Sequence, residues 1–216
     1  MIRVNAISFQ RNIPKTSFSR NSEKDVLDKA MKELENVELA DKDIDYVKSI
    51  GANPPFNSGK EAFDFIKQQN IKVKFEKLHS KNVHAQWDVD KNTIRINEIY
   101  KNTRKQAVIL AIAEAIFHEA GHAKDFDGQS SIQEEIDCLS LNAMAHNDFK
   151  RKYKNVFDNN NEPIIKNGVC LYSEIYFEPD KKRLSLKVKN TYGHLPLGDE
   201  KHSSKELAKI IKYRNF

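Results

Sequence analysis

Cysteine is scarce in this sequence, with only Cys138 and Cys170 among 216 residues. Two cysteines provide no disulfide framework, so the sequence does not belong to the small disulfide-stapled proteins, and we expect both thiols to be reduced and buried. Long apolar runs are also missing. Glu114 interrupts the apolar stretch at 107–117, which falls short of the roughly 20 apolar residues that cross a bilayer. We therefore expect no membrane partner.

Residues 1–10 do not have the pattern of a signal peptide, and the net charge is modest. Residues 1–10 lack the apolar region of a secretory signal, which predicts a cytoplasmic protein or one exported by a route without a cleaved signal peptide. The net charge of +5 comes from scattered lysines, densest at 150–154 and 181–183, and acidic residues are plentiful. No nucleic-acid-binding motif accompanies these clusters, so we interpret them as solvated faces and expect no nucleic-acid partner.

One short motif carries most of the chemical information. Residues 118–122 read His-Glu-Ala-Gly-His, an HExxH pattern, and the strong helix formers at 106–117 predict that it lies on a buried helix. Histidines four residues apart share one face of a helix, so His118 and His122 can reach a single metal ion. Glu119, beside the first histidine, is then placed to act as a general base.

The residues before this helix favour a small sheet. Residues 85–89 and 93–97 are β-prone runs on either side of Asp90-Lys91-Asn92, which predicts a hairpin. Residues 71–76 alternate between polar and apolar side chains and predict a further strand in the same sheet. After the motif, residues 130–143 fit a second helix, capped by Ser130 or Ser131.

A small sheet followed by a buried HExxH helix resembles the core of the zincin metallopeptidases, matched here by His118, Glu119 and His122. In that family an exposed edge strand holds an extended substrate beside the metal. The metzincin branch is excluded, because Asp125 and Gly128 occupy the positions of its glycine and third histidine. The segment Glu-Glu-Ile-Asp in the second helix resembles instead the small bacterial gluzincin-like peptidases.

That resemblance implies a zinc ion (Zn2+) held by His118, His122 and a glutamate of the following helix. Glu135 is the third ligand that it implies, with Glu134 as the alternative, because the two side chains lie about 100° apart and only one can face the metal. Asp125, one turn beyond His122, is a lesser candidate. By the same resemblance, Asp137 would orient a ligating histidine from behind.

The expected fold class is α+β: a small mixed or antiparallel sheet packed on the HExxH helix and the following glutamate helix, with a C-terminal β-hairpin. The breaker cluster at 51–57 divides the sequence into an N-terminal arm and charged helix (1–57, the helix at about 22–39) and a zincin-like domain (58–216). The domain has its core at 71–146 and an extension at 155–216. In the extension we expect the hairpin at 169–177 and 183–188 and a last helix from about Ser203.

The function that these observations predict is a zinc-dependent endopeptidase acting on a protein or peptide substrate. Tyr192 and His194, in a loop-like stretch, are candidate donors to the oxyanion that forms during peptide hydrolysis. The alternative is a non-catalytic zincin-like binding protein, although a structural metal site has no need of Glu119. A third hypothesis, an interaction module with an accidental HExxH, predicts no bound metal at all.

Overall fold

Seven α-helices and a three-stranded sheet form an α+β fold in the computed structural model, which describes residues 23–128 and 130–198. The helices are α1 (Glu23–Glu35), α2 (Asp41–Ser49), α3 (Gly59–Gln68), α4 (Gln106–Lys124), α5 (Ile132–Lys152), α6 (Pro163–Phe177) and α7 (Lys181–Tyr192). The strands are β1 (Lys72–Glu76), β2 (Ala85–Asp88) and β3 (Thr93–Asn97), followed by a 3-10 turn, η1 (Glu98–Tyr100).

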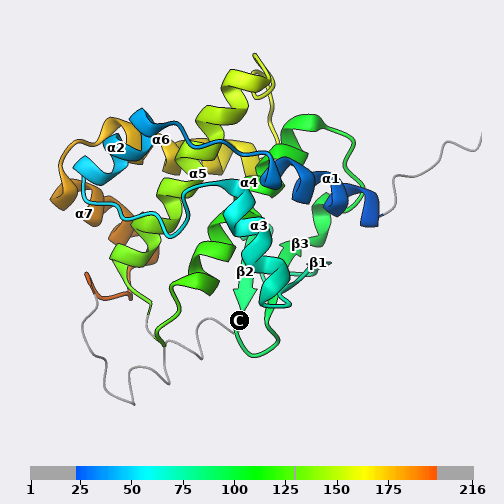
Figure 1. Ribbon diagram of the computed structural model, residues 1–216, viewed down its shortest axis with the longest axis horizontal. Helices are drawn as coiled ribbons and strands as arrows, with labels where there is room; N and C mark the ends of the chain where they lie inside the picture. Colours follow the sequence, from blue (N-terminus) through cyan, green and yellow to red (C-terminus); the bar gives the residue numbers. More distant parts are fainter. Residues whose placement is uncertain (1–22, 129, 199–216) are drawn as a thin grey trace, which may run out of the picture.

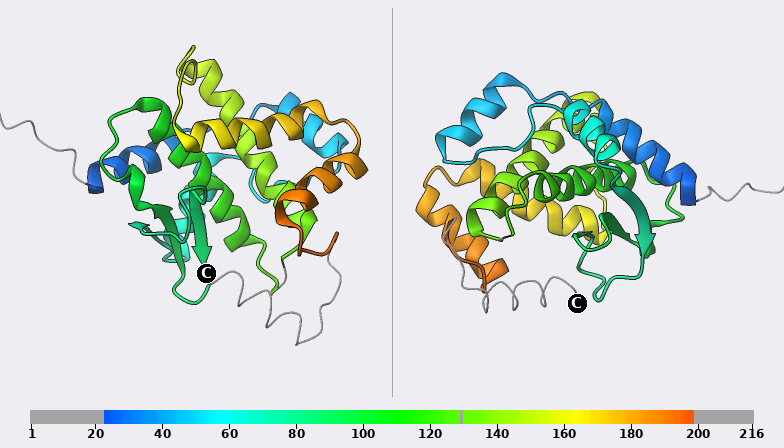
Figure 2. Two further views of the ribbon diagram at one scale, coloured as in Figure 1. Left: turned by 180° about the vertical axis from the view of Figure 1, so that it is seen from behind. Right: turned by 60° about the horizontal axis from the view of Figure 1, so that its bottom comes forward.

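Helix α4 lies at the centre, between the sheet and the C-terminal helices (Figure 1; Figure 2, right). Its sequence is apolar on every side, and this is why most of its residues are buried. Helix α5 packs along it, α1 and α3 pack on another side, and α6 also contacts it. One hydrophobic core runs from Val26 to Leu195, so the described part of residues 1–57 shares its core with the rest of the protein.

The sheet is mixed, with strand order β1-β3-β2. The expected hairpin is present: β2 pairs antiparallel with β3, placing Trp87 opposite Ile94. The expected third strand, β1, pairs parallel with β3. Ile94 and Ile96 are fully buried, and the sheet contacts α4 through β2 and β3. Strand β2 is therefore an edge strand lying beside the HExxH helix.

The predicted C-terminal β-hairpin is wrong, because both of its segments are helical. Residues 169–177 belong to α6, which starts with Pro163 at its first turn. Residues 183–188 belong to α7, whose N-cap Asp180 accepts a hydrogen bond from the Lys182 amide. The apolar positions of α6 recur at helical spacing over its whole length; its buried residues are Ile164, Ile165, Gly168, Tyr172 and Ile175.

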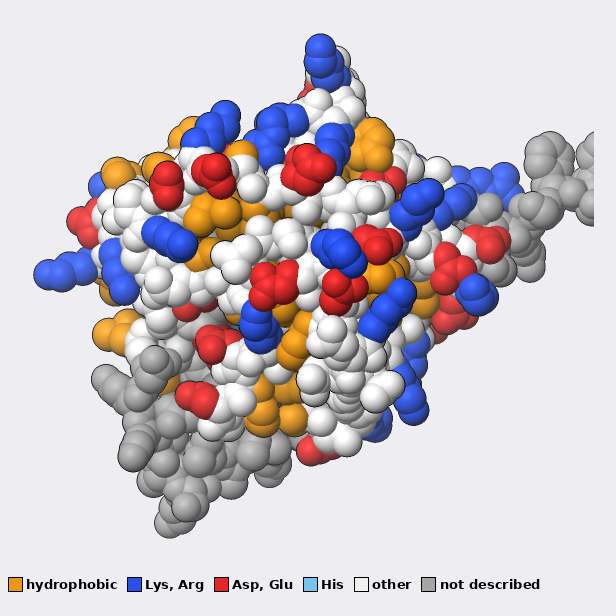
Figure 3. All heavy atoms as spheres, viewed as in Figure 1, with side chains coloured by type: hydrophobic (Ala, Val, Ile, Leu, Met, Phe, Trp, Pro, Cys, Tyr) orange, Lys and Arg blue, Asp and Glu red, His pale blue; other side chains and the backbone are white. Residues whose placement is uncertain are grey.

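The N-terminal prediction also needs correction. The charged helix ends at Glu35, and a separate helix, α2, follows it. The arm around Asn12-Ile13-Pro14 and the helix expected from Ser203 lie outside the described residues. Across the ranges 23–128 and 130–198, no helix combines the length and apolar character needed to cross a membrane. On the face drawn in Figure 3, basic and acidic side chains are interspersed.

Candidate metal centre

Two turns of α4 present the histidines of the motif to the same point. His118 and His122 are buried, and their Nε2 atoms lie 3.0 Å apart. Because α4 is regular through this region, the spacing of four residues places both imidazoles on one helix face, as the sequence predicts. The pair forms one side of a candidate site.

Helix α5 supplies a carboxylate from the opposite side. Oxygens of Glu135 lie 3.7 Å from His118 Nε2 and 3.6 Å from His122 Nε2. One ligand atom from each of these three side chains falls within 4.8 Å of the others, which is close enough for a common metal ion. Ser131 sets the start of α5: its hydroxyl accepts from the Glu134 amide, and the Glu134 side chain completes a capping box. This cap fixes the register that turns Glu135 toward the histidines.

The Nδ1 atom of each histidine has its own acceptor. His118 Nδ1 lies 2.7 Å from Asn142 Oδ1, and His122 Nδ1 lies 2.6 Å from Glu134 Oε1. Glu134 thus sits behind His122, on the side away from Glu135. Hydrogen bonds of this kind hold the proton on Nδ1 and direct the Nε2 lone pair toward a metal.

Asp137 does not take the orienting position expected for it. Its carboxylate accepts hydrogen bonds of 2.7 Å from the Asn53 amide and from Gln133 Nε2, on a different face of α5. The residue that the sequence reasoning missed is Asn142. It lies seven residues, about two helical turns, after Glu135, so the helical period alone places both on one face.

The charges around His122 determine its protonation. Burial lowers the pKa of its imidazole, while Cys138, Glu135 and Glu134 raise it, and the net pKa lies well above the ordinary value. Burial raises the pKa of the Cys138 thiol to about 12, so this thiol stays neutral and the two carboxylates supply the charge. A protonated His122 can donate from Nε2 to His118 Nε2. A metal ion has to displace that proton in order to bind.

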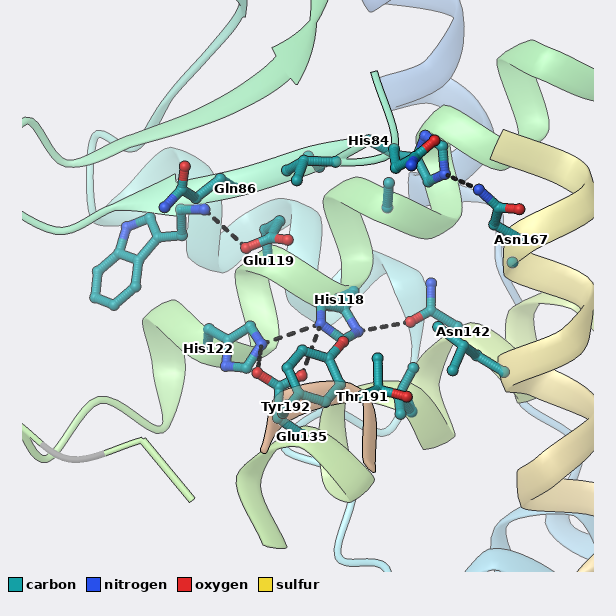
Figure 4. A pocket seen from close by; sticks show the side chains of 18 of the residues that line it. His84, Gln86, His118, Glu119, His122, Glu135, Asn142, Asn167, Thr191 and Tyr192 are labelled. Atoms are coloured by element: carbon teal, nitrogen blue, oxygen red, sulfur yellow. Dashed lines mark hydrogen bonds and ion pairs between the residues drawn. The ribbon is translucent and has the colours of Figure 1, made fainter. Parts of the chain in front are cut away.

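Glu119 points away from the three clustered side chains toward the edge strand (Figure 4). One oxygen of its carboxylate accepts a 2.7 Å hydrogen bond from the Trp87 amide of β2. The contact shows that this amide faces away from β3 and toward α4. The carboxylate is therefore held between the strand and the histidine pair.

Tyr192 reaches the site from α7. It is the last residue of that helix, rather than part of a loop as the sequence suggested. Its hydroxyl is hydrogen-bonded to Glu135, and burial raises its pKa well above the usual value, with Glu135 adding to the rise. Figure 4 shows its ring beside Glu135 and the two histidines. His194 lies two residues further on and lines the same cavity.

This cavity, of about 730 Å³, extends from the histidines along β2 and under α6. Ala85, Gln86 and Trp87 form the wall contributed by β2, and Asn167 and Leu171 belong to the wall contributed by α6. Its lining is mostly apolar. A cavity with these features can accept a ligand considerably larger than the metal ion.

Comparisons with protein-family models, with curated protein sequences and with solved structures returned no match to this sequence.

Proposed function

We propose that the protein is a zinc-dependent endopeptidase of the zincin type, close in its ligand arrangement to the small gluzincin-like enzymes. The observation that carries this proposal is the convergence of His118, His122 and Glu135 in one buried cluster, with Glu119 on the same helix beside them. Two imidazoles and one carboxylate make up a ligand set typical of catalytic zinc sites, which keep one further position open.

The donor atoms support zinc on chemical grounds. Both Nδ1 atoms are occupied by acceptors, Asn142 and Glu134, so both Nε2 atoms face Glu135 and can serve as ligands once His122 has lost its Nε2 proton. The two nitrogens and the carboxylate oxygen also converge from two different helices, which leaves the side facing the cavity open. Hard cations such as Mg2+ and Ca2+ prefer all-oxygen ligands, so this set favours zinc over them.

Zinc held by these residues would supply Lewis acidity for a water molecule and a substrate carbonyl. Glu119 would accept a proton from the attacking water and pass it to the leaving amine. Tyr192 is the candidate donor to the developing oxyanion: its single hydroxyl proton goes to Glu135 here and would turn to the oxyanion once Glu135 holds zinc. His194 lines the cavity and is a second candidate for this role.

Strand β2 supports a polypeptide as the substrate. The Trp87 amide points away from β3, and Ala85, two residues earlier on the same strand, directs its backbone groups to the same side. An extended peptide can pair with this edge by main-chain hydrogen bonds and lie across the cavity next to Glu119. Binding through main-chain groups suits cleavage within a protein segment.

Metal analysis of the full-length protein tests the metal site. We expect about one zinc per molecule, lost in His118→Ala and in Glu135→Ala. The matched control is Glu134→Ala, which removes the neighbouring carboxylate. Since Glu134 contacts His122 at Nδ1 and not at the Nε2 atom that faces Glu135, this variant should bind zinc about 10–100-fold more weakly but keep the stoichiometry. A wild-type protein that binds no zinc when zinc is supplied would refute the proposal.

Cleavage is tested with a degenerate peptide library analysed by mass spectrometry. Glu119→Gln should keep its zinc and lose hydrolysis, because the amide cannot accept the proton of water. This variant separates an enzyme from the alternative of a non-catalytic binding protein. Zinc binding without cleavage of any library member by the wild type would favour the alternative.

A further inference from the structure

A series of buried polar groups continues behind His118, away from the metal side. The Oδ1 atom of Asn142, on α5, accepts a 2.7 Å hydrogen bond from His118 Nδ1. Its Nδ2 atom donates to the backbone oxygen of Glu114 at 3.0 Å and to the Tyr172 hydroxyl at 3.1 Å. These contacts join α4, α5 and α6 (Figure 4 draws the first of them).

The series ends on a buried carboxylate. The Tyr172 hydroxyl is hydrogen-bonded to the Glu114 side chain, and Glu114 Oε1 lies 2.9 Å from His146 Nδ1. Glu114 is 1% exposed and Asn142 is 4% exposed, so bulk water does not reach these two side chains. We call Asn142, Tyr172, Glu114 and His146 the buried polar network.

The donors and acceptors of the network can be arranged in only one direction. A backbone oxygen accepts only, so the Glu114 carbonyl requires the nitrogen of the Asn142 amide to face it. The Tyr172 oxygen lies 3.1 Å from the same amide nitrogen and accepts its other proton. Both constraints turn Asn142 Oδ1 toward His118. An oxygen there accepts a proton from Nδ1, which leaves Nε2 unprotonated.

We propose that the buried polar network positions His118 and fixes its Nδ1–H tautomer, so that Nε2 is presented to the metal before the metal arrives. Asn142, Tyr172 and Glu114 are positioning residues for the proposed peptidase reaction, and this inference rests on the proposed function. The two histidines have different hydrogen-bond partners at Nδ1. The Glu134 carboxylate is the partner of His122, whereas the neutral Asn142 amide, oriented by Glu114, is the partner of His118.

The packing around Tyr172 leaves its hydroxyl little room to move. A Cβ atom on Gly168, one turn earlier on α6, would lie 3.1 Å from the Tyr172 hydroxyl. The absence of a side chain there leaves that oxygen room to reach Asn142 and Glu114. Gly168→Ala is therefore a perturbation that keeps every polar group of the network and displaces one of them.

The first arm of the test uses metal-free, full-length protein labelled with 15N-histidine. Imidazole 15N shifts at alkaline pH report the tautomer of each histidine, and a His118→Ala sample assigns the signal. We expect the Nδ1–H form for His118 in the wild type and loss of this preference in Asn142→Leu. An Nε2–H form in the wild type would overturn the proposal, whether or not the protein binds zinc.

The second arm measures zinc affinity by chelator competition, the visible spectrum of the cobalt(II) protein, and the melting temperature. Tyr172→Phe should bind zinc about tenfold more weakly, with an altered cobalt spectrum, and Gly168→Ala should shift both in the same direction. Tyr153→Phe is the matched control, because its hydroxyl also bonds a carboxylate, that of Glu33, outside the network. We expect its zinc affinity and its cobalt spectrum to equal those of the wild type.

Each outcome separates the two proposals. If Tyr172→Phe lowers only the melting temperature and keeps wild-type affinity and spectrum, the network is structural and the inference is wrong. If the wild type binds no zinc, the proposed function fails, and the tautomer in the first arm still decides whether the network orients His118.

Discussion

Gly121, inside the HExxH motif, makes a closer contact than any side chain would allow. A Cβ atom at this position would lie 2.8 Å from Cys138 Sγ on α5 and 3.1 Å from Leu141 Cδ1. Cys138 is completely buried and follows Glu135 by three residues, so it cannot move without moving the turn of α5 that carries the glutamate. We predict that Gly121→Ala forces α4 and α5 apart at the candidate site.

The magnitude follows from two opposing effects. Alanine gains about 1 kcal/mol of helix propensity over glycine in the middle of α4. Overpacking a well-packed core costs about 1–3 kcal/mol, and the contact at 2.8 Å, against a short side chain fixed to a helix, places this variant at the upper end. We expect a net loss of about 1–2 kcal/mol, or about 2–8 °C in melting temperature for a protein of this size.

A double-mutant cycle with Cys138→Ala tests the reasoning. Removing the sulfur makes room for the new methyl group, so Gly121→Ala should cost less in the Cys138→Ala background than in the wild type. Urea denaturation gives the four free energies of unfolding, and chelator competition gives the four zinc affinities. The reasoning would be refuted if the effects of the two substitutions on the free energy of unfolding were additive. It would also be refuted if the Gly121→Ala protein were as stable as the wild type.

Three further predictions concern individual side chains. Tyr192→Phe, which removes the hydroxyl bonded to Glu135, should keep its zinc and lower kcat about a hundredfold; unchanged turnover would exclude the oxyanion role. Burial raises the pKa of Asp137 from 3.8 to about 7, so the folded state holds more protons than the unfolded state between these values, and stability falls as pH rises through this window, by up to about 4 kcal/mol. Asp137→Asn should remove this part of the pH dependence, and equal slopes of unfolding free energy against pH for the two proteins would contradict it. Ser131→Ala, which breaks the capping box of α5, should lose about 1 kcal/mol in thermal denaturation, and an unchanged melting temperature would show that the cap is dispensable.

The C-terminal third shows how a local reading of the sequence failed. Residues 169–177 are rich in β-prone side chains, and a window that starts at Val169 lacks the first turn of the helix. With Pro163, Ile164 and Ile165 included, the helical period and the N-terminal proline become visible. Packing of this helix on α4 and α5 then outweighs the β propensity of its side chains.

The candidate metal site also combines features that local sequence rules predict with features that depend on tertiary packing. The sequence by itself determined that His118 and His122 share a helix face with Glu119 adjacent, because helix geometry converts a spacing of four into proximity. It also determined the hairpin and, to within one residue (Ser130 or Ser131), the start of α5, since both depend on residues close together in the sequence. Short-range rules were sufficient for these features.

Only the tertiary structure decided what faces the histidines from elsewhere. The packing of α5 on α4 turns Glu135 toward both Nε2 atoms and Glu134 behind His122, a choice that sequence spacing left open. The packing of α6 and α7 brings Tyr172 and Tyr192, which lie more than 50 residues from His118, into the lining of the same cavity. Such contacts depend on how buried helix faces fit together, and that fit is a property of the whole core, which no local pattern encodes.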